Sequence, residues 1–402
     1  MDTRTGLPVV GMVGGGQLAR MTHQAAIALG QSLRVLAAAP DDGAALVAAD
    51  VQIGAHTDLE TLRRFAQGCD VVTFDHEHVP PAMIRALEED GVNVAPRAAA
   101  LRFAQDKAAM RTRLAELGAP MPRWAPVTTA ADVEAFAAQT SWRVVLKATT
   151  GGYDGRGVWV VGSASEAATV VERGTPLIVE ERVRLRREVA VMVARSPFGQ
   201  VATYPVVETV QRDGICVEVI APAPDLDPDL AVDAQELAIR IATELGVVGV
   251  LAVELFDDGE RLLVNELAMR PHNSGHWTID GARTSQFEQH LRAVLDYPLG
   301  DTASTAPWVV MVNILGGPEG GMKLDERVHH MMAAEPAVKL HLYGKQPRPG
   351  RKLGHVTALG SDLEAVRASA ERAAAWLHNG VDPDTALETS TDRDRERDEV
   401  RV

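Results

Sequence analysis

The stretch from Arg143 to Val161, RVVLKATTGGYDGRGVWVV, decides the fold of this 402-residue chain. Two apolar runs, 144–146 and 158–161, flank a turn rich in glycine. This order predicts a β-hairpin with an enlarged tip. Glycines in such a tip let backbone N–H groups approach an anion closely, and Lys147 and Arg156 add positive charge. The stretch therefore predicts a flap over a polyphosphate, with a simple flexible hairpin as the alternative.

Composition narrows the classes of function. The length allows two or three domains with a large buried core. A net charge of −15 argues against a general nucleic-acid-binding surface. The two cysteines, Cys69 and Cys216, have neither metal-site spacing nor a disulfide framework, which fits a reducing compartment. With no signal-peptide pattern and no run of membrane-spanning length, we expect a cytoplasmic protein that acts on small molecules.

The first hundred residues alternate between strand and helix patterns, which predicts a parallel sheet covered by helices. Strands are expected at 7–12, 33–38 and 70–74, and helices at 18–29 and 59–67. A glycine turn, Gly14–Gly16, precedes the first helix and forms an expected site for a small phosphorylated ligand. A nicotinamide site fits less well, because the second strand lacks an acid at its end to bind a ribose.

An acidic and histidine-rich segment, TFDHEHVPP at 73–81, follows the third strand. Asp75, His76, Glu77 and His78 could form a metal site, but charge on the surface of a loop is the commoner outcome and is our expectation. Glu77, at the carboxyl end of a strand, is placed to meet a ligand in the crevice of an open sheet.

The order of strand and helix patterns in the middle of the chain predicts a small lid domain over a nucleotide. A helix is expected over 103–117, carrying Asp106 and Lys107, and Gly118 and two prolines mark a boundary after it. Further elements are a strand at 123–127, a helix at 131–139, a strand at 176–181 and a strand at 188–193. Glu180 and Glu181 end the third of these and could accept hydrogen bonds from adenine or ribose.

A second hairpin, with strands at 250–256 and 261–267, carries Glu254, Asn265 and Glu266 among apolar neighbours. A turn near residues 259–260 would place Glu254 opposite Glu266, although a slip of one residue would separate them. Buried carboxylates need a partner, and Mg²⁺ prefers carboxylates together with substrate phosphates. The polar loop 269–280 follows directly and is a candidate for ligand binding.

The C-terminal part contains expected strands at 308–315 and 338–342 and a helix at 363–377. A cationic segment that includes Lys345, Arg351 and Lys352 suits a phosphate monoester. From residue 382 the sequence is charged and without apolar periodicity, so we expect a disordered tail.

These motifs together carry a family resemblance. Lys147, the loop GGYDGRG, Glu254, Asn265–Glu266 and NSGHWT resemble the ATP-grasp superfamily and, within it, the N5-carboxyaminoimidazole ribonucleotide synthetase family, over about residues 7–377. The resemblance implies an α/β and α+β ATP-grasp fold with a Rossmann-like pre-ATP-grasp domain. The implied divisions are an N-terminal domain at 1–100, a linker helix and lid at 101–190, a central domain at 191–300, a C-terminal domain at 301–380 and a tail at 381–402.

The resemblance also implies an activity. Such enzymes use ATP, Mg²⁺ and bicarbonate to carboxylate 5-aminoimidazole ribonucleotide through carboxyphosphate, giving N5-carboxyaminoimidazole ribonucleotide, ADP and phosphate in purine biosynthesis. It further implies a cytoplasmic homodimer. The alternatives are another ATP-grasp ligase, such as a formate-dependent glycinamide ribonucleotide transformylase, a nicotinamide-dependent oxidoreductase, or a non-catalytic nucleotide sensor.

Site residues follow from the matching motifs. The implied catalytic residues are Asp154, Lys345 and Arg351. The nucleotide would contact Lys107, Lys147, Gly152, Tyr153, Asp154, Gly155, Arg156, Gly157, Glu180, Glu181, Arg182, Val183, Glu188, Gln211, Asn265 and Glu266. The ribonucleotide would contact Gln17, Leu18, Glu77, Arg270, Asn273, Ser274, His276, Lys345, Arg351 and Lys352, and Mg²⁺ would bind Glu254 and Glu266.

Three positions depart from the family pattern. Gln211 stands where a histidine is common, which leaves the nucleotide contact there open. Lys107 stands where an arginine can occur, which keeps the charge but loses the fork-shaped group. Asp75 stands where glutamate is usual.

Overall fold

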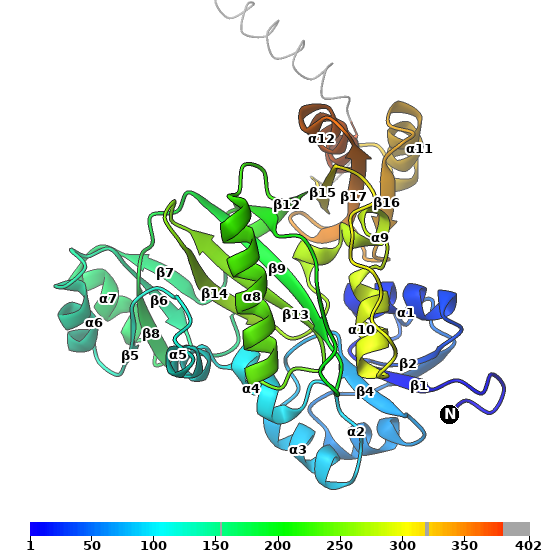
Figure 1. The fold of residues 1–402 in the computed structure, drawn as a ribbon, viewed down its shortest axis with the longest axis horizontal. Helices are drawn as coiled ribbons and strands as arrows, with labels where there is room; N and C mark the ends of the chain where they lie inside the picture. The colour runs from blue at the N-terminus through cyan, green and yellow to red at the C-terminus, as the bar shows by residue number, and fades with distance from the viewer. Residues whose placement is uncertain (153–154, 318–320, 381–402) are drawn as a thin grey trace, which may run out of the picture.

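The computed structural model describes residues 1–152, 155–317 and 321–380 and contains three β-sheets (Figure 1). Tyr153 and Asp154 of the flap, and the predicted tail, lie outside the described residues. In Figure 1 the lid lies on one side of the molecule and the N-terminal sheet lies below the long central sheet.

The N-terminal unit is the predicted parallel sheet, with strand order β3-β2-β1-β4. Its strands are β1 (Val9–Val13), β2 (Ser32–Ala37), β3 (Asp50–Ile53) and β4 (Val71–Phe74), and its helices are α1 (Gln17–Ala28), α2 (Leu59–Ala66) and α3 (Pro81–Glu89). All five residues of β1 are buried, as expected of a strand in a sheet covered on both faces. Strand β3 was not predicted, because this partly exposed edge strand lacks an apolar run.

The single helix predicted over 103–117 is wrong: two helices, α4 (Ala98–Gln105) and α5 (Lys107–Glu116), meet at Asp106. Asp106 has extended backbone angles, φ −131° and ψ 108°. Its carboxylate accepts hydrogen bonds from Ala108 N at 2.9 Å and Ala109 N at 3.1 Å, so it caps α5. The helical periodicity on both sides concealed the break. As a result, Lys107 stands at the first position of α5.

We expect Asp106→Ala to lower the free energy of unfolding by about 1 kcal/mol, because two N–H groups at the start of α5 lose their acceptor. Chemical denaturation followed by circular dichroism measures this loss. Asp106→Asn is the matched control, since asparagine is also a good N-cap and should stay near the wild type. Equal stability of the two variants would show that the cap contributes nothing.

The lid is a four-stranded sheet of order β5-β8-β6-β7. It contains β5 (Trp124–Val127), β6 (Val144–Ala148), β7 (Val158–Val161), β8 (Leu177–Glu181), α6 (Ala130–Ala137) and α7 (Ala164–Val171). Strands β6 and β7 pair antiparallel, Val144 with Val161 through Lys147 with Val158, which confirms the predicted flap hairpin. The core of the lid, which includes Leu146, lies between this sheet and the two helices.

The central sheet has nine strands, in the order β14-β13-β9-β11-β12-β15-β17-β16 with β10 beside β9. The strands are β9 (Arg187–Arg195), β10 (Val201–Thr203), β11 (Val207–Arg212), β12 (Ile215–Ala221), β13 (Gly249–Asp257), β14 (Leu262–Ala268), β15 (Trp308–Leu315), β16 (Lys339–Leu342) and β17 (Lys352–Gly360). The helices are α8 (Pro228–Glu244), α9 (Thr278–Gly281), α10 (Gln286–Val294), α11 (Leu324–Ala334) and α12 (Leu363–Asn379), with a 3₁₀ turn at Asn273–Gly275.

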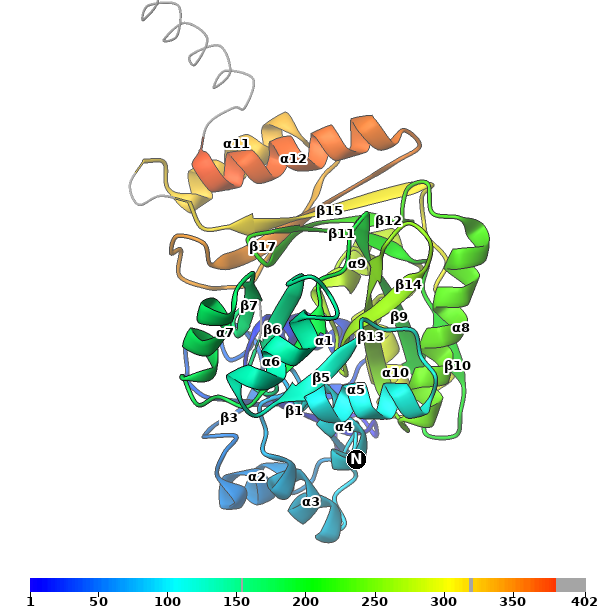
Figure 2. The same ribbon diagram turned by 90° about the vertical axis from the view of Figure 1, so that its left-hand side faces the viewer.

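The C-terminal strands continue the central sheet, because β12 pairs with β15 and β15 with β17. Helices α11 and α12 cover one face of these strands (Figure 2). Strand β17 thereby brings the predicted cationic segment into the same sheet as the Glu254–Glu266 hairpin.

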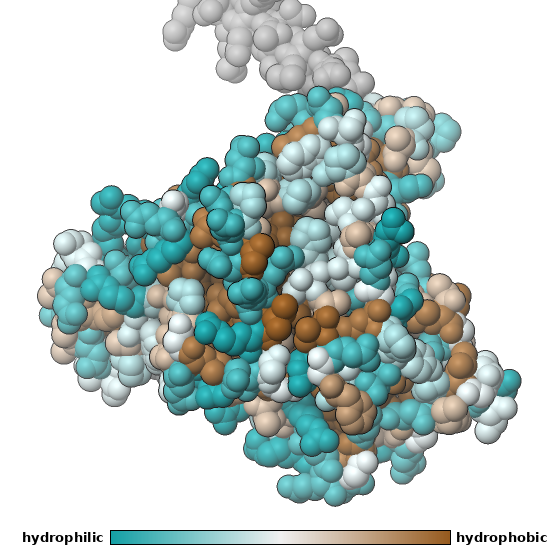
Figure 3. All heavy atoms as spheres, viewed as in Figure 1, coloured by the Kyte–Doolittle hydropathy of each residue, from teal (hydrophilic) through white to brown (hydrophobic). Residues whose placement is uncertain are grey.

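The surface view in Figure 3 is mostly hydrophilic, and hydrophobic residues gather in a band near the lower ends of α8 and α10. Among the described residues, no helix is long and apolar enough to cross a bilayer.

Candidate functional site

The hairpin β13–β14 places two carboxylates opposite each other. Glu254 pairs directly with Glu266, which is one of the two registers that the sequence left open. Since Leu255 pairs with Val264, Asn265 is the extra residue of a β-bulge between them. The bulge gives the second strand an additional polar side chain at the site.

The electrostatics of this pair suit a divalent cation. Burial raises the pKa of Glu254, and the nearby Glu266 and Glu188 raise it further. No three His, Cys, Asp or Glu side chains of the described residues are grouped to hold a metal ion. The two carboxylates fit Mg²⁺, which typically completes its shell with water and substrate phosphates.

His272 lies against Glu254, with Nε2 3.5 Å from Oε1. Burial, with Arg270 and Lys352 nearby, lowers the pKa of His272 to about 3, so the imidazole is neutral at pH 7. The contact is therefore no ion pair, and His272 does not neutralise the carboxylate pair.

Both predicted phosphate-binding lysines reach this hairpin. Lys107 Nζ lies 2.5 Å from Glu266 Oε1. Lys147 Nζ contacts Asn265 Oδ1 at 2.9 Å and Glu180 Oε2 at 2.8 Å. Burial lowers the pKa of Lys147, while Glu180 opposes this shift. Two lysines, two carboxylates and one amide thus meet where the lid joins the central sheet.

The predicted adenine and ribose residues lie along the same border. Glu180 is only 2 % exposed. Burial alone would raise its pKa, but Lys147 and Arg111 hold it below the usual value. Glu181 is bound to Arg123 at 2.8 Å. Glu188 is the second residue of β9 and lies near Lys147, and burial raises its pKa.

The remaining predicted nucleotide residues lie on either side of this border. Arg182 N donates to Arg143 O at 2.8 Å, and Val183 follows it in the connection to β9. Gln211 pairs with Cys216 across β11 and β12.

The described part of the flap tip shows the backbone that its glycines permit. Gly155 and Gly157 have φ of 74° and 75°, in the left-handed region that favours glycine. A Cβ at Gly155 would stand 3.2 Å from Gly214 Cα, so the flap approaches the β11–β12 turn. A Cβ at Gly152 would meet Arg156 O at 2.8 Å. These backbone angles and close approaches account for the glycines at 152, 155 and 157.

A second cluster joins the N-terminal unit to the C-terminal strands. Lys345, in the β16–β17 connection, donates a hydrogen bond to Gln17 Oε1 at the start of α1. Arg351 and Lys352 follow in the same connection and at the start of β17, with Arg351 Nη1 donating to Gln346 O at 3.3 Å. Leu18 packs beside Tyr343. The structure therefore brings Lys345 to Gln17 and Leu18, which are distant in sequence and were predicted to bind the same ribonucleotide.

The expectation of surface charge at Asp75 is wrong, because this side chain is 7 % exposed. Asp75 Oδ2 accepts a hydrogen bond from Gly16 N at 2.6 Å, inside the glycine turn. A Cβ at Gly14 would lie 1.7 Å from Asp75 Oδ1, so the turn and the carboxylate are fitted to each other. Part of the predicted anion site is thus filled by the protein's own carboxylate.

Glu77 connects the N-terminal unit to the polar loop. Its Oε1 accepts from Met269 N at 2.9 Å, and its Oε2 lies 3.3 Å from Arg270 Nη2. Ser274 and His276 are buried within the loop, where Ser274 contacts His272 and His276 contacts Gln286. Asn273 begins the 3₁₀ turn. The loop is therefore fixed on both sides.

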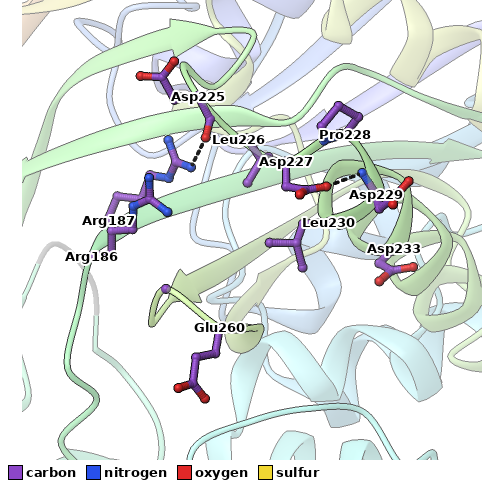
Figure 4. A pocket seen from close by; sticks show the side chains of 11 residues that line it. Arg186, Arg187, Asp225, Leu226, Asp227, Pro228, Asp229, Leu230, Asp233 and Glu260 are labelled. Carbon is purple, nitrogen blue, oxygen red and sulfur yellow. Dashed lines mark hydrogen bonds between the residues drawn. The ribbon is translucent and has the colours of Figure 1, made fainter.

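An open cavity of about 690 Å³ lies at the N-terminus of α8 and the β13–β14 turn (Figure 4). Its lining includes five carboxylates against two arginines, and no predicted site residue lines it. This excess of negative charge would repel a polyphosphate. We therefore place the functional site at the lid border and not in this cavity.

Sequence reasoning missed Arg111, which binds Glu180 from α5. It lies four residues after Lys107, and residues at this spacing share one face of a helix. That spacing was the available signal, but the broken helix at Asp106 concealed which face was buried.

We expect Asp75→Asn to become more stable relative to the wild type as the pH rises from 4 to 7. Burial raises the pKa of Asp75 from 3.8 to about 6, so the folded state binds more protons than the unfolded state in this window. As the pH rises from about 4 through about 6, the free energy of unfolding of the wild type falls by up to about 3 kcal/mol, because the buried carboxyl group must ionise. Asparagine has no proton to lose and avoids this cost. Urea unfolding at several pH values measures the difference.

Asp41→Asn is the control for this experiment, because Asp41 is an exposed carboxylate of the same unit. It should follow the wild type at every pH. A difference between Asp75→Asn and wild type that stays constant with pH would contradict the buried, proton-binding role of Asp75.

Three family models match the chain. They are an ATP-grasp domain over residues 112–287, a ribonucleotide synthetase preATP-grasp domain over 7–105, and a phosphoribosylaminoimidazole carboxylase C-terminal domain over 309–369. The ATP-grasp match spans the lid sheet and strands β9 to β14 of the central sheet, and the C-terminal match spans strands β15 to β17 of that same sheet.

Curated relatives are similar in sequence to this protein along nearly the whole chain. The protein named N5-carboxyaminoimidazole ribonucleotide synthase of Mycobacterium tuberculosis is 60% identical over 380 residues, 93% of this chain and 88% of the relative. The protein of the same name from Corynebacterium ammoniagenes is 53% identical, covering 94% and 93%.

Solved structures show the same likeness. The Thermus thermophilus N5-carboxyaminoimidazole ribonucleotide synthetase has a TM-score of 0.83 and 39% identity, covering 92% of this chain and 98% of that one. The Aspergillus clavatus enzyme, solved with ADP and 5-aminoimidazole ribonucleotide, has a TM-score of 0.84 and 31% identity, with coverages of 92% and 98%.

Proposed function

The chain belongs to the N5-carboxyaminoimidazole ribonucleotide synthase family of ATP-grasp proteins, and from this premise we infer that it is a ligase that carboxylates 5-aminoimidazole ribonucleotide with ATP and bicarbonate. The observation that carries this inference is that the structure assembles two clusters of predicted site residues. One sets Lys107 and Lys147 against the Glu254–Glu266 hairpin, and the other sets Lys345 against Gln17.

Bicarbonate is a poor electrophile, because it would have to expel hydroxide or oxide. Its oxygen attacks the γ-phosphorus of ATP, which breaks the bond to ADP and forms carboxyphosphate. Carboxyphosphate then releases phosphate and CO₂ next to the exocyclic amine of 5-aminoimidazole ribonucleotide. The amine attacks that carbon and loses a proton, and the products are N5-carboxyaminoimidazole ribonucleotide, ADP and phosphate.

The protein mainly positions these groups and stabilises charge. Lys107 and Lys147 would bind ATP phosphates, and Glu254 and Glu266 would hold Mg²⁺, which neutralises phosphate charge when bound. Each lysine now contacts a carboxylate, so phosphate would replace or share these contacts.

The flap and the border strands would enclose the nucleotide. Gly152, Gly155, Arg156 and Gly157 would close over the phosphates. The adenosine would contact Glu180, Glu181, Arg182, Val183, Glu188 and Gln211. Asp154 is the proposed proton acceptor for the amine, on the strength of the family motif alone.

The ribonucleotide would lie between the N-terminal unit and β17. Lys345, Arg351 and Lys352 supply positive charge for its phosphate. The other contacts would come from Gln17, Leu18, Glu77, Arg270, Asn273, Ser274 and His276. Arg270 is oriented by Glu77. Since Ser274 and His276 are buried, they would act mainly by holding the loop.

The test is release of ADP from MgATP and bicarbonate, with and without 5-aminoimidazole ribonucleotide, while the carboxylated product is followed. We expect strong stimulation by the ribonucleotide and one carboxylated product per ADP. Turnover that requires formate and glycinamide ribonucleotide would instead identify a formate-dependent transformylase. Absence of ATP turnover with either acceptor would refute the ligase assignment.

We further infer a cytoplasmic homodimer, as the family resemblance implies. Both cysteines are free, and burial raises the pKa of Cys69 to about 11 and of Cys216 to about 12. These protonated thiols suit a reducing compartment. Light scattering of the purified protein tests the dimer, and a monomer at micromolar concentration would contradict it.

A further inference from the structure

Arg111 in α5 is completely buried, with 0% of its surface exposed. A guanidinium carries five N–H donors and stays charged at any physiological pH. Burial of such a group is costly unless each donor finds a partner. The partners of Arg111 therefore show what this charge does in the fold.

Two of its donors hold the bulge in β14. Nη1 donates to Val264 O at 2.6 Å, and Nη2 donates to Asn265 O at 2.8 Å. A bulge interrupts the regular ladder, so its carbonyl groups need other donors. Arg111 supplies them and thereby fixes the backbone from which the side chains of Asn265 and Glu266 project.

A third donor holds the lid. Arg111 Nε donates to Glu180 Oε1 at 2.8 Å, and Glu180 ends β8. Arg111 therefore connects a strand of the lid sheet to a strand of the central sheet. It does so from α5, the helix whose first residue is Lys107.

Both of these connections lead to the same lysine. Lys147 Nζ contacts Glu180 Oε2 at 2.8 Å and Asn265 Oδ1 at 2.9 Å. Each partner of Lys147 is thus held on its other side by Arg111. Movement of Arg111 would release the carboxylate and the bulge together, and Lys147 would lose its position.

We propose that Arg111 is a positioning residue of the nucleotide site, which sets Lys147 and Glu180 for ATP by holding the β14 bulge and the end of β8. The proposal rests on the function inferred above, because it takes Lys147 as a phosphate contact and Glu180 as the acceptor for the adenine amino group. In this proposal Arg111 acts through Lys147 and Glu180 and does not itself bind the nucleotide. Substitution of Arg111 should therefore weaken ATP binding and reduce the preference for adenine over guanine at the same time.

The test measures dissociation constants of ATP and GTP by calorimetry, without bicarbonate or ribonucleotide. Arg111→Met should raise the dissociation constant of ATP at least about tenfold, because it removes the charge-assisted hydrogen bonds that hold Glu180 and the β14 bulge in place. The preference for ATP over GTP should fall about tenfold as well, because guanine has a carbonyl oxygen at C6, where adenine has the amino group that would donate a hydrogen bond to Glu180. In turnover, the KM for the ribonucleotide should change less than about twofold.

The matched control is Arg113→Met, which removes a charge from the same helix. Arg113 is partly exposed and pairs with Glu116 and Glu244, away from the bulge. The dissociation constants of ATP and GTP for Arg113→Met should equal those of the wild type. If Arg111→Met does not fold, Arg111→Lys decides, because lysine keeps the charge but lacks the fork that reaches two carbonyls and a carboxylate.

For Arg111→Lys we expect weaker ATP binding than in the wild type and a smaller preference for ATP. Unchanged ATP affinity and unchanged base preference in the folded variant would overturn the proposal. A loss of thermal stability with both nucleotide constants intact would do the same, because Arg111 would then be only a structural residue. Failure of carboxylation by the wild type would refute the proposed function but would leave these binding measurements interpretable.

Discussion

A Glu254→Gln/Glu266→Gln double variant is expected to lose at least about 1,000-fold in kcat, the effect of several kcal/mol of lost charge stabilisation. The two carboxylates face each other across β13 and β14, and no third carboxylate, histidine or cysteine among the described residues forms a metal site with them. Glutamine keeps the size of each side chain but binds Mg²⁺ poorly. Steady-state release of ADP measures the loss.

Glu260→Gln is the matched control, because Glu260 is exposed at the tip of the same hairpin. It should keep wild-type activity. Chelation of Mg²⁺ by EDTA should abolish wild-type turnover, and added Mg²⁺ should restore it. Substantial activity of the double variant at saturating MgATP, with the protein folded by circular dichroism, would place the metal elsewhere.

Lys345→Met is expected to raise the KM for 5-aminoimidazole ribonucleotide about 30- to 150-fold, because a charge-assisted bond to phosphate contributes about 2 to 3 kcal/mol. Lys345 comes from the β16–β17 connection and reaches Gln17 at the start of α1. It lies in the second cluster and not among the contacts of the Glu254–Glu266 hairpin. The KM for ATP should therefore remain near the wild-type value.

Lys339→Met serves as the control, since Lys339 is an exposed lysine of β16. It removes the same charge from the neighbouring strand without touching α1, and both KM values should be unchanged. If Lys345→Met raised the KM for ATP and left that for the ribonucleotide unchanged, the assignment of the second cluster to the ribonucleotide would be wrong.

Local sequence patterns were sufficient for the elements that carry most of the site. The flap hairpin 143–161 was predicted from two apolar runs and the glycines between them, and the structure confirms its pairing. The hairpin that carries Glu254 and Glu266 followed from a turn near residues 259–260, whereas the direct pairing of these two carboxylates depends on the bulge at Asn265. These features depend on residues close together in the chain, whose backbone preferences and periodicity act within a few residues.

Interactions between distant segments decided the rest. Strand β3 pairs at the edge of its sheet without an apolar pattern, and the break at Asp106 depends on a single side chain that caps α5. The burial of Asp75 follows from the close approach of the glycine turn. None of these features has a periodic signal.

The sequence by itself determined the parallel N-terminal sheet and the two hairpins of the site, because each is encoded by neighbouring residues. Only the tertiary structure decided that Arg111 joins Glu180 to the β14 bulge and that Lys345 meets Gln17. Such contacts join residues separated by 69 to 328 positions. Their geometry depends on how the sheets pack against one another, and no local pattern specifies that packing.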